Sequence, residues 1–245
     1  FPETTSVTSM KGLFYNCTSL ESIPADLFKP FGTAKLKFSQ TFEGCKSLKS
    51  IPEGLFAANT ATTHFAGAFI DCTSLESVPE NLLASCANLT YVNKMFSGCT
   101  SLKSVPEKFF AGNPKIIIFE ETFSGCTALE TIPEKLFASI GTTTTGITFA
   151  RCFYGCSALR SLPAGLFDTV RRISFINSCF EGCTSLIGES PYTMIGGEKI
   201  HLYERVQGDD FPRVPSNRTA HEGCFKGCTR LSDYATMPEE WVTVQ

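Results

Sequence analysis

The chain has 245 residues, of which 42% are hydrophobic and 18% charged, and its 21 basic and 24 acidic residues give a net charge of −3. This composition is too apolar for a disordered chain, and the slight negative charge excludes a broad basic surface for nucleic acid. No run of about 18 apolar residues occurs, so we expect no membrane span. The chain starts at a Phe followed by a polar stretch, which indicates neither an initiator Met nor a signal peptide.

An internal repeat that centres on a Phe-x-x-Cys segment dominates the sequence. The repeat cysteines are Cys17, Cys45, Cys72, Cys99, Cys126, Cys156, Cys183 and Cys228. Their separations are 28, 27, 27, 27, 30, 27 and 45 residues, so the period is nearly constant until one insertion. A fixed period of this length is typical of solenoids, in which each unit stacks on its neighbours. We number the units 1 to 8 after these cysteines and count positions from the cysteine, which is position 0.

Three further positions repeat with each unit. A Phe stands at −3 and a Leu at +3 in every unit, for example Phe96 and Leu102 in unit 4. A residue that recurs in every coil of a stack supplies one continuous column, so we expect both columns in the core. Position −1 is Gly except for Asn16 and Asp71. These residue types tolerate positive φ, which predicts a left-handed residue that ends each Phe-containing turn.

The rest of each unit predicts short strands and helical turns. After the Leu, six units read x-Ser/Thr-Ile/Val/Leu-Pro, as at 21–24. We expect a strand that ends at the Pro, which then starts a helical turn because its fixed φ suits that position. A second extended piece, such as 115–119, leads to the next Phe. Strands of successive coils would pair in parallel.

The first residue after the Leu alternates in charge along the repeat. This column at +4 reads Glu21, Lys49, Glu76, Lys103, Glu130 and Arg160. Paired strands lie about 4.8 Å apart, so we expect each charge to lie between two opposite ones. Exposed ion pairs contribute only about 0–1 kcal/mol each, which favours a role in register and solubility. Contact with a ligand is the alternative, and these six residues are candidate binding residues.

The repeat pattern becomes irregular between units 7 and 8. Residues 187–220 form an irregular insertion that either covers the end of the stack or presents a ligand-binding loop. Its aromatic side chains Tyr192, Tyr203 and Phe211 are expected to be exposed and are further candidate binding residues. Trp241, near the end of the chain, is expected to close the last coil.

The cysteines and histidines indicate packing rather than chemistry. We expect the repeat cysteines and Cys86 to be buried free thiols, since a buried Cys acts as a small hydrophobe. The last three units carry a second cysteine at −4, a slot that small or apolar residues fill elsewhere, and an occasional disulfide within this cluster is the alternative. No spacing typical of zinc ligands and no catalytic motif occurs, so we expect no metal, no cofactor and no enzymatic activity. The three histidines, His64, His201 and His221, lie far apart in sequence.

The consensus Phe-x-Gly-Cys-Thr-Ser-Leu-x-Ser-Ile/Val-Pro-Glu-x-Leu-Phe resembles the leucine-rich repeats of BspA-like bacterial surface proteins over roughly residues 10–238. A repeat family with Met-Phe-x-x-Cys units in surface lipoproteins is almost as similar, as 95–99 illustrates. The resemblance implies an α/β fold: a right-handed leucine-rich-repeat solenoid of about eight coils of about 27 residues, with short parallel strands and helical turns. We expect one domain over 1–245, with a lead-in (1–9), regular repeats (10–186), the insertion (187–220) and a last repeat with a cap (221–245).

Membership of that family would imply a secreted or cell-surface, adhesin-like recognition module. Its partner would be a host or microbial protein or a glycan, bound by a monomer on the face that the short strands form or on the insertion loop, with neither nucleic acid nor membrane span involved. The alternative is a structural spacer of a larger surface assembly with no ligand of its own. A third possibility, a glycan-cleaving enzyme, would need two carboxyl groups about 5–10 Å apart in a cleft.

Overall fold

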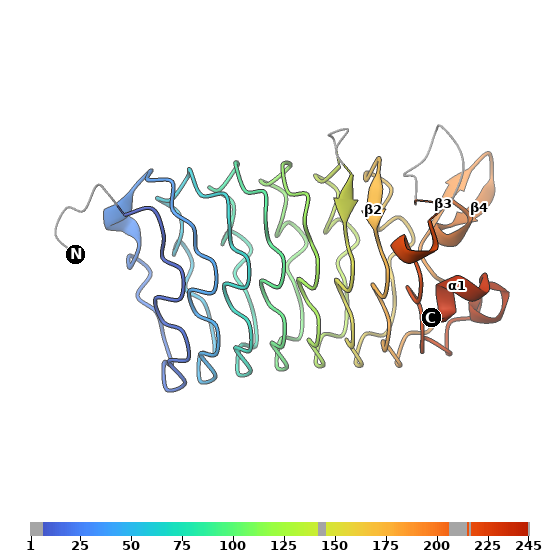
Figure 1. Ribbon diagram of the computed structural model, residues 1–245, viewed down its shortest axis with the longest axis horizontal. Coiled ribbons are helices and arrows are strands. Elements are labelled where there is room, and N and C mark those ends of the chain that lie inside the picture. Colours follow the sequence, from blue (N-terminus) through green and yellow to red (C-terminus); the bar gives the residue numbers. More distant parts are fainter. Residues whose placement is uncertain (1–6, 142–145, 206–214, 216, 245) are drawn as a thin grey trace.

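The computed structural model describes residues 7–141, 146–205, 215 and 217–244. The repeat units lie side by side as successive coils of one elongated stack, with the N-terminal units at one end and the C-terminal segment at the other (Figure 1). Backbone hydrogen bonds join each unit to the next with the same offset, from −3 to −4: the Phe42 amide donates to Ala68 at 2.8 Å, and the Phe96 amide donates to Thr122 at 2.9 Å. Matching residues of neighbouring units therefore touch, as the repeat predicts.

Regular secondary structure is sparse and short. The elements are η1 (Lys29–Phe31), β1 (Ile147–Thr148), β2 (Ile173–Phe175), β3 (Tyr192–Ile195), β4 (Glu198–His201), η2 (Leu202–Glu204), η3 (Arg218–Ala220), η4 (Tyr234–Thr236) and α1 (Glu239–Val242). β1 and β2 pair in parallel, and β3 and β4 form an antiparallel hairpin. Elsewhere the coils are joined in parallel by single residue pairs. Within the described ranges, no helix has the length and apolar character that a membrane crossing requires.

The structure corrects the prediction of a helical turn after each Pro. The chain makes isolated turns there, closed by bonds such as Leu82 N to Pro79 O and Phe109 N to Pro106 O, both 3.2 Å. In the described part of the six units that carry this Pro, only unit 1 continues into a 3-10 helix, η1. A short segment gains too few i to i−4 bonds to offset the cost of starting a helix, so the chain changes direction by turns alone.

The core is a ladder of stacked rings. The phenylalanines at −3 stack nearly parallel, with ring centroids 5.3 Å apart for Phe42 and Phe69 and 5.6 Å apart for Phe69 and Phe96. The leucines at +3 are buried from Leu48 onward, and one continuous core runs from Met10 to Trp241. Unit 1 is the exception, since a coil of the described residues covers it on one side only.

Each coil contains two left-handed residues rather than one. All eight residues at −1 have positive φ, as predicted, from 53° at Asp71 to 82° at Gly227. A second set lies four residues earlier, at Gly12, Gln40, Gly67, Lys94, Glu121, Arg151, Ser178 and Gly223. Between these two bends the amides at −5, −3 and −1 all point at the next coil. In unit 2 they donate to Ala66, Ala68 and Ile70 at 2.7–2.9 Å.

The C-terminal segment takes the place of a further coil. The Phe225 amide donates to the Trp241 carbonyl at 2.9 Å, and the two rings lie 6.1 Å apart. Trp241, on α1, is fully buried, as expected for a residue that closes the core. Tyr203 corrects the sequence prediction: it is only 8% exposed, because its ring packs edge-on against Trp241 at 6.3 Å. Phe211 lies outside the described residues.

Candidate functional site

The repeat cysteines belong to the core. The Cys72 thiol donates to the carbonyl of Phe42 at 3.2 Å, and later units repeat this bond to the preceding coil. Burial raises the pKa of Cys86 to about 12 and the pKa of the other buried thiols as well, which keeps them protonated and unreactive. Cys17 is exposed, contrary to expectation, because no described coil covers that side of unit 1. In the described part of the chain, no three potential metal ligands converge.

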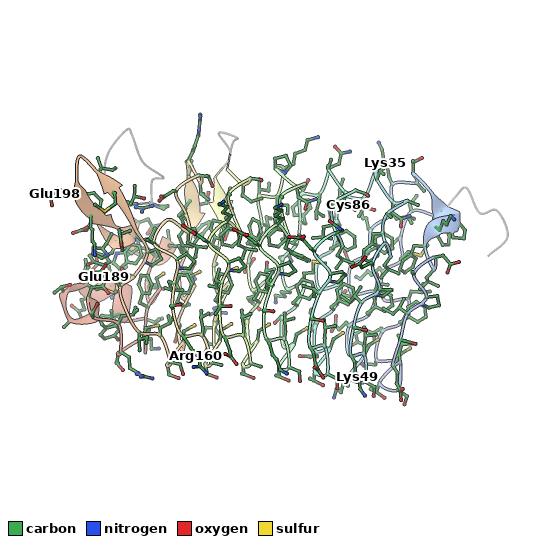
Figure 2. All side chains as sticks on the ribbon, turned by 180° about the vertical axis from the view of Figure 1, so that it is seen from behind. Lys35, Lys49, Cys86, Arg160, Glu189 and Glu198 are labelled. Atoms are coloured by element: carbon green, nitrogen blue, oxygen red, sulfur yellow. The ribbon has the colours of Figure 1, made fainter. Side chains whose placement is uncertain are left out.

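The charged column at +4 forms a parallel backbone ladder. The amide of each member from Glu76 onward donates to the carbonyl of the preceding member, for example Lys103 to Glu76 at 3.3 Å. Ion pairs join Lys103 to Glu76 at 3.9 Å and Arg160 to Glu130 at 3.6 Å, and all four side chains are more than half exposed. Figure 2 shows Lys49 and Arg160 on one long edge of the stack and Lys35 on the opposite edge. Opposite charges are thus neighbours along this ladder, and their contact with a ligand stays a prediction.

The insertion contributes a hairpin beside the capped end. Tyr192 on β3 is partly buried, and the Lys199 Nζ lies 4.6 Å from its ring centroid. The hairpin is pinned to unit 8 by Asp233, which accepts hydrogen bonds from the Ser190 amide at 3.1 Å and the Ser190 hydroxyl at 2.6 Å. Met194 is 56% exposed near the hairpin turn. The described part of the insertion therefore packs onto the stack and exposes little aromatic surface.

A surface column that sequence reasoning missed lies at position −8. Parallel residue pairs connect its members from one unit to the next: Ser9, Lys37, His64, Tyr91, Ile118, Thr148 and Phe175. In unit 2 the neighbours Leu36 and Phe38 are fully buried while Lys37 is exposed, so the column faces outward. Because its residue types vary from unit to unit, the repeat search gives no signal for it. We call this column, with the outward residues at −6, the strand face.

The strand face carries an aromatic pair in units 3 and 4. The rings of His64 and Tyr91 lie 4.4 Å apart at an angle of 33°. Burial, with a smaller contribution from the positive charge of Lys37, lowers the pKa of His64. The imidazole is therefore neutral near pH 7, and its Nδ1 lies 2.7 Å from the Thr63 hydroxyl. The pair presents a half-buried, uncharged ring surface to solvent.

Residues that follow this aromatic pair along the chain line a hollow. Its volume is about 420 Å³, and its lining consists of Lys11, Ser39, Gln40, Ala66, Gly67, Ile70, Asn93 and Lys94. Ala66 and Asn93 follow His64 and Tyr91 by two residues, and residues two apart in an extended segment face the same side. The hollow and the aromatic pair are thus neighbours along the chain in units 3 and 4.

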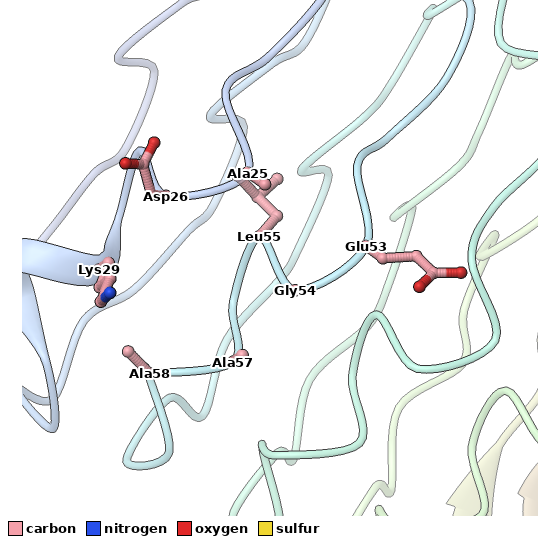
Figure 3. A pocket seen from close by; sticks show the side chains of 8 residues that line it. All are labelled: Ala25, Asp26, Lys29, Glu53, Gly54, Leu55, Ala57 and Ala58. Carbon is pink, nitrogen blue, oxygen red and sulfur yellow. The ribbon is translucent and has the colours of Figure 1, made fainter.

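Two other cavities lack this convergence of polar and aromatic groups. One of about 470 Å³ lies between the Pro turns of units 1 and 2, where Glu53 is directed away from Asp26 and Lys29 (Figure 3). Two facing carboxylates, which glycoside cleavage would need, are not present there among the described residues. The other, of about 310 Å³, lies at the end of the charged column beside Arg160, Ile187 and Arg230.

Comparison with family models and with curated proteins gives no match. Among solved structures, the chain is similar to a leucine-rich repeat protein from Eubacterium ventriosum, at 18% identity and a TM-score of 0.40, over 80% of this chain and 41% of that one. A leucine-rich repeat protein of T. pallidum is 17% identical with a TM-score of 0.35, over 100% of this chain and 85% of that one. The APL1 leucine-rich repeat domain is 16% identical with a TM-score of 0.36, over 71% of this chain and 37% of that one.

The chain thus spans less than half the length of the Eubacterium and APL1 chains. The similarities are to leucine-rich repeat structures, and their identities and TM-scores are too low to carry a conclusion about ligand or partner.

Proposed function

We propose that the protein is a non-catalytic recognition module that binds its ligand through the strand face of units 1 to 4. The observation that carries the proposal is the pairing of His64 and Tyr91 at 4.4 Å, two residues before Ala66 and Asn93, which line a hollow of about 420 Å³. Binding sites are typically concave, partly apolar and provided with a few placed polar groups. The strand face offers this combination, and a uniformly charged surface would not.

The charged column at +4 is a weaker binding surface. Glu76 and Lys103 already form an ion pair with each other. Because both side chains are exposed, this pair contributes little to the free energy of folding or binding. Aromatic residues in partly desolvated positions usually supply most of the binding energy of an interface. We therefore propose that Tyr91 and His64 contact the ligand and that the charged column fixes the register between neighbouring coils.

The proposal extends to location and family. The repeat consensus supports a BspA-like surface protein that works outside the cell as an adhesin-like module, with a protein or a glycan as partner. The alternative is a spacer within a larger surface assembly, favoured by the mixed-sign pairs Glu76–Lys103 and Glu130–Arg160, which suit solubility rather than affinity.

An array of glycans and matrix proteins tests recognition against the spacer function. We expect at least one hit, and we expect that hit to be lost in the double variant His64→Ala/Tyr91→Ala. Lys103→Ala is the matched control, because it removes an exposed side chain of the charged column and should keep full binding. An empty array, or hits that survive the double variant, would contradict the proposed function.

A further inference from the structure

We infer that the side of unit 1 that faces away from unit 2 binds a Phe-x-x-Cys coil of another polypeptide, which adds to the stack as one further coil. This side, at the N-terminal end of the stack (Figure 1), carries Leu13, Phe14, Tyr15 and Cys17, and we call it the end face. The inference goes beyond the proposed function, because the end face is a different surface from the strand face.

The end face presents a row of backbone carbonyls that lack donors. In unit 2 the carbonyls at −6, −4 and −2 each accept an amide of unit 1, at 2.7–3.2 Å. The same three carbonyls of unit 1 belong to Lys11, Leu13 and Tyr15, and no described residue donates to them. Unpaired groups along such an edge are a template for another chain. A partner must therefore bring amide donors at every second residue.

Apolar side chains lie among these carbonyls. Leu13 is 42% exposed and Tyr15 is 52% exposed, whereas Thr41, which takes the position of Leu13 in unit 2, is fully buried. The ring of Phe14 stacks on Phe42 at 5.2 Å, and its other face meets no ring of the described residues. A partner that covers these groups removes apolar surface from water, which stabilises the complex.

The thiol of Cys17 also lacks the partner that the repeat provides elsewhere. The other seven repeat cysteines donate to the carbonyl at −3 of the preceding coil, as Cys45 does to Phe14 at 3.2 Å. Cys17 is exposed, and none of the residues in the described ranges accepts its thiol. A coil that adds to unit 1 in the register of the repeat would place its own carbonyl at −3 beside this thiol.

The bends of unit 1 favour a coil of this repeat over a flat strand or a sugar chain. The backbone of unit 1 is left-handed at Gly12 and Asn16, with φ of 64° and 55°. A coil with the same two bends would present its amides at −5, −3 and −1 to the end face, as unit 1 presents its own to unit 2. Main-chain bonds would then supply affinity, and a Phe at −3 that stacks on Phe14 would supply specificity.

A second copy of this chain fits the end face poorly. Two end faces that meet would bring carbonyl against carbonyl, without donors between them. At the opposite end of the stack, the amides of Gly223 and Phe225 already donate to Glu240 and Trp241, at 2.8 and 2.9 Å. The C-terminal segment thus occupies the donors that an end face would need, and the partner is a different polypeptide.

The test titrates the whole chain with a synthetic peptide of sequence 91–102 from unit 4, in which Cys99→Ala prevents a disulfide with Cys17. Cys17 is the only exposed cysteine of the twelve, so its alkylation by iodoacetamide reports on the end face. We expect the peptide to bind with a Kd below about 1 mM and to slow this alkylation at least about tenfold at saturation. A peptide that is N-methylated at Phe96 and Gly98 lacks two of the donors and should bind about tenfold more weakly or less.

Protein variants locate the bound peptide. Leu13→Asp places a carboxylate beside the unpaired carbonyls and should weaken peptide binding about tenfold or more. Val244→Asp is the matched control, because Val244 is similarly exposed, at 41%, and belongs to the opposite end of the stack. The double variant His64→Ala/Tyr91→Ala should bind the peptide as tightly as the parent chain, since it changes only the strand face.

Unchanged alkylation of Cys17 at about 1 mM peptide would overturn the inference. Equal protection by the methylated peptide would also overturn it, because backbone pairing would then not be involved. Peptide binding that is lost in the His64→Ala/Tyr91→Ala variant and leaves Cys17 reactive would overturn the inference and support the proposed function. Protection of Cys17 together with an empty glycan and protein array would support the inference and contradict the proposed function alone.

Discussion

The thiol of Cys99 donates a hydrogen bond to the backbone carbonyl of Phe69, 3.1 Å away across the boundary between two coils. The same bond joins six other pairs of thiol and carbonyl at 3.0–3.2 Å: Cys45–Phe14, Cys72–Phe42, Cys126–Phe96, Cys156–Phe123, Cys183–Phe153 and Cys228–Phe180. Each carbonyl also accepts the amide of the cysteine three residues later, as Phe69 does from Cys72 at 3.3 Å, so the thiol bond from the next coil uses its second lone pair. The thiol therefore joins successive coils as well as filling space.

Replacing one core thiol should destabilise the whole stack. We expect Cys99→Ser to lower the free energy of unfolding by about 1–3 kcal/mol, because serine buries a more strongly hydrated group in the same apolar column. Urea unfolding in a reducing buffer measures the change. Cys17→Ser is the control, because Cys17 is exposed and should tolerate the change within about 0.5 kcal/mol. Equal effects at both positions would contradict the buried ladder.

The left-handed bend at −1 predicts a sharp difference between two substitutions of one glycine. Gly125 has a φ of 71°. Gly125→Val should cost about 1–3 kcal/mol, because a β-branched residue is strained at positive φ. Gly125→Asn should cost much less, since Asn16 occupies the same position with a φ of 55°. Chemical denaturation of both variants checks the prediction, and a valine as well tolerated as the asparagine would show that the bend does not require left-handed backbone.

Buried thiols should make the protein sensitive to alkali. Burial raises the pKa of Cys86 from 9.0 to about 12. The unfolded chain therefore releases this proton near pH 9 while the folded chain retains it. The stabilisation is complete below pH 9 and is lost as the pH rises from 9 toward 12, by about 1.4 kcal/mol per pH unit for each such thiol.

Unfolding free energies at pH 7, 9 and 10.5 in a reducing buffer test this slope. Cys86→Val removes one titrating thiol, so its stability should fall less steeply above pH 9 than that of the parent chain. Parallel curves for the two proteins would mean that Cys86 ionises equally in the folded and unfolded states.

The cap at the C-terminal end should be essential for stability. Trp241 is fully buried against Phe225, and we expect Trp241→Ala to cost about 3–5 kcal/mol by opening the end of the core. Val244, three residues later, is 41% exposed, and Val244→Ala should change the melting temperature little. A small effect of the tryptophan variant in calorimetry would mean that the last coil needs no cover.

The sequence repeat predicts the core residues well, because every coil must present the same packing surface to its neighbours. Phe and Leu recur at −3 and +3 because each coil presents the same surface to the next, and the glycines at −1 recur because few residues adopt positive φ. The second left-handed bend, at −5, has no recurring residue type in the sequence that would predict it. Lys94, Glu121 and Arg151 adopt positive φ there because the coil-to-coil hydrogen bonds on either side hold the backbone, whatever the side chain.

The candidate site could not be predicted from the repeat, because its residues differ from unit to unit. The residues of this column change from Lys37 through the aromatic His64 and Tyr91 to Ile118, so a search for a recurring residue type does not detect it. The column at +4 is visible in the sequence because its charges alternate, and in the structure Glu76 pairs with Lys103 and Glu130 with Arg160. Tyr203 was expected to be exposed from its place in an irregular segment, and packing against Trp241 buries it.

Hydroxyl-radical footprinting of the chain, with and without the tightest ligand from the array, tests the central claim that the strand face is the binding surface. We predict that oxidation of His64 and Tyr91 falls on binding, while Met194 on the hairpin, which is 56% exposed, reacts as before. Protection of Met194 with His64 and Tyr91 unchanged would contradict the claim and move recognition to the insertion.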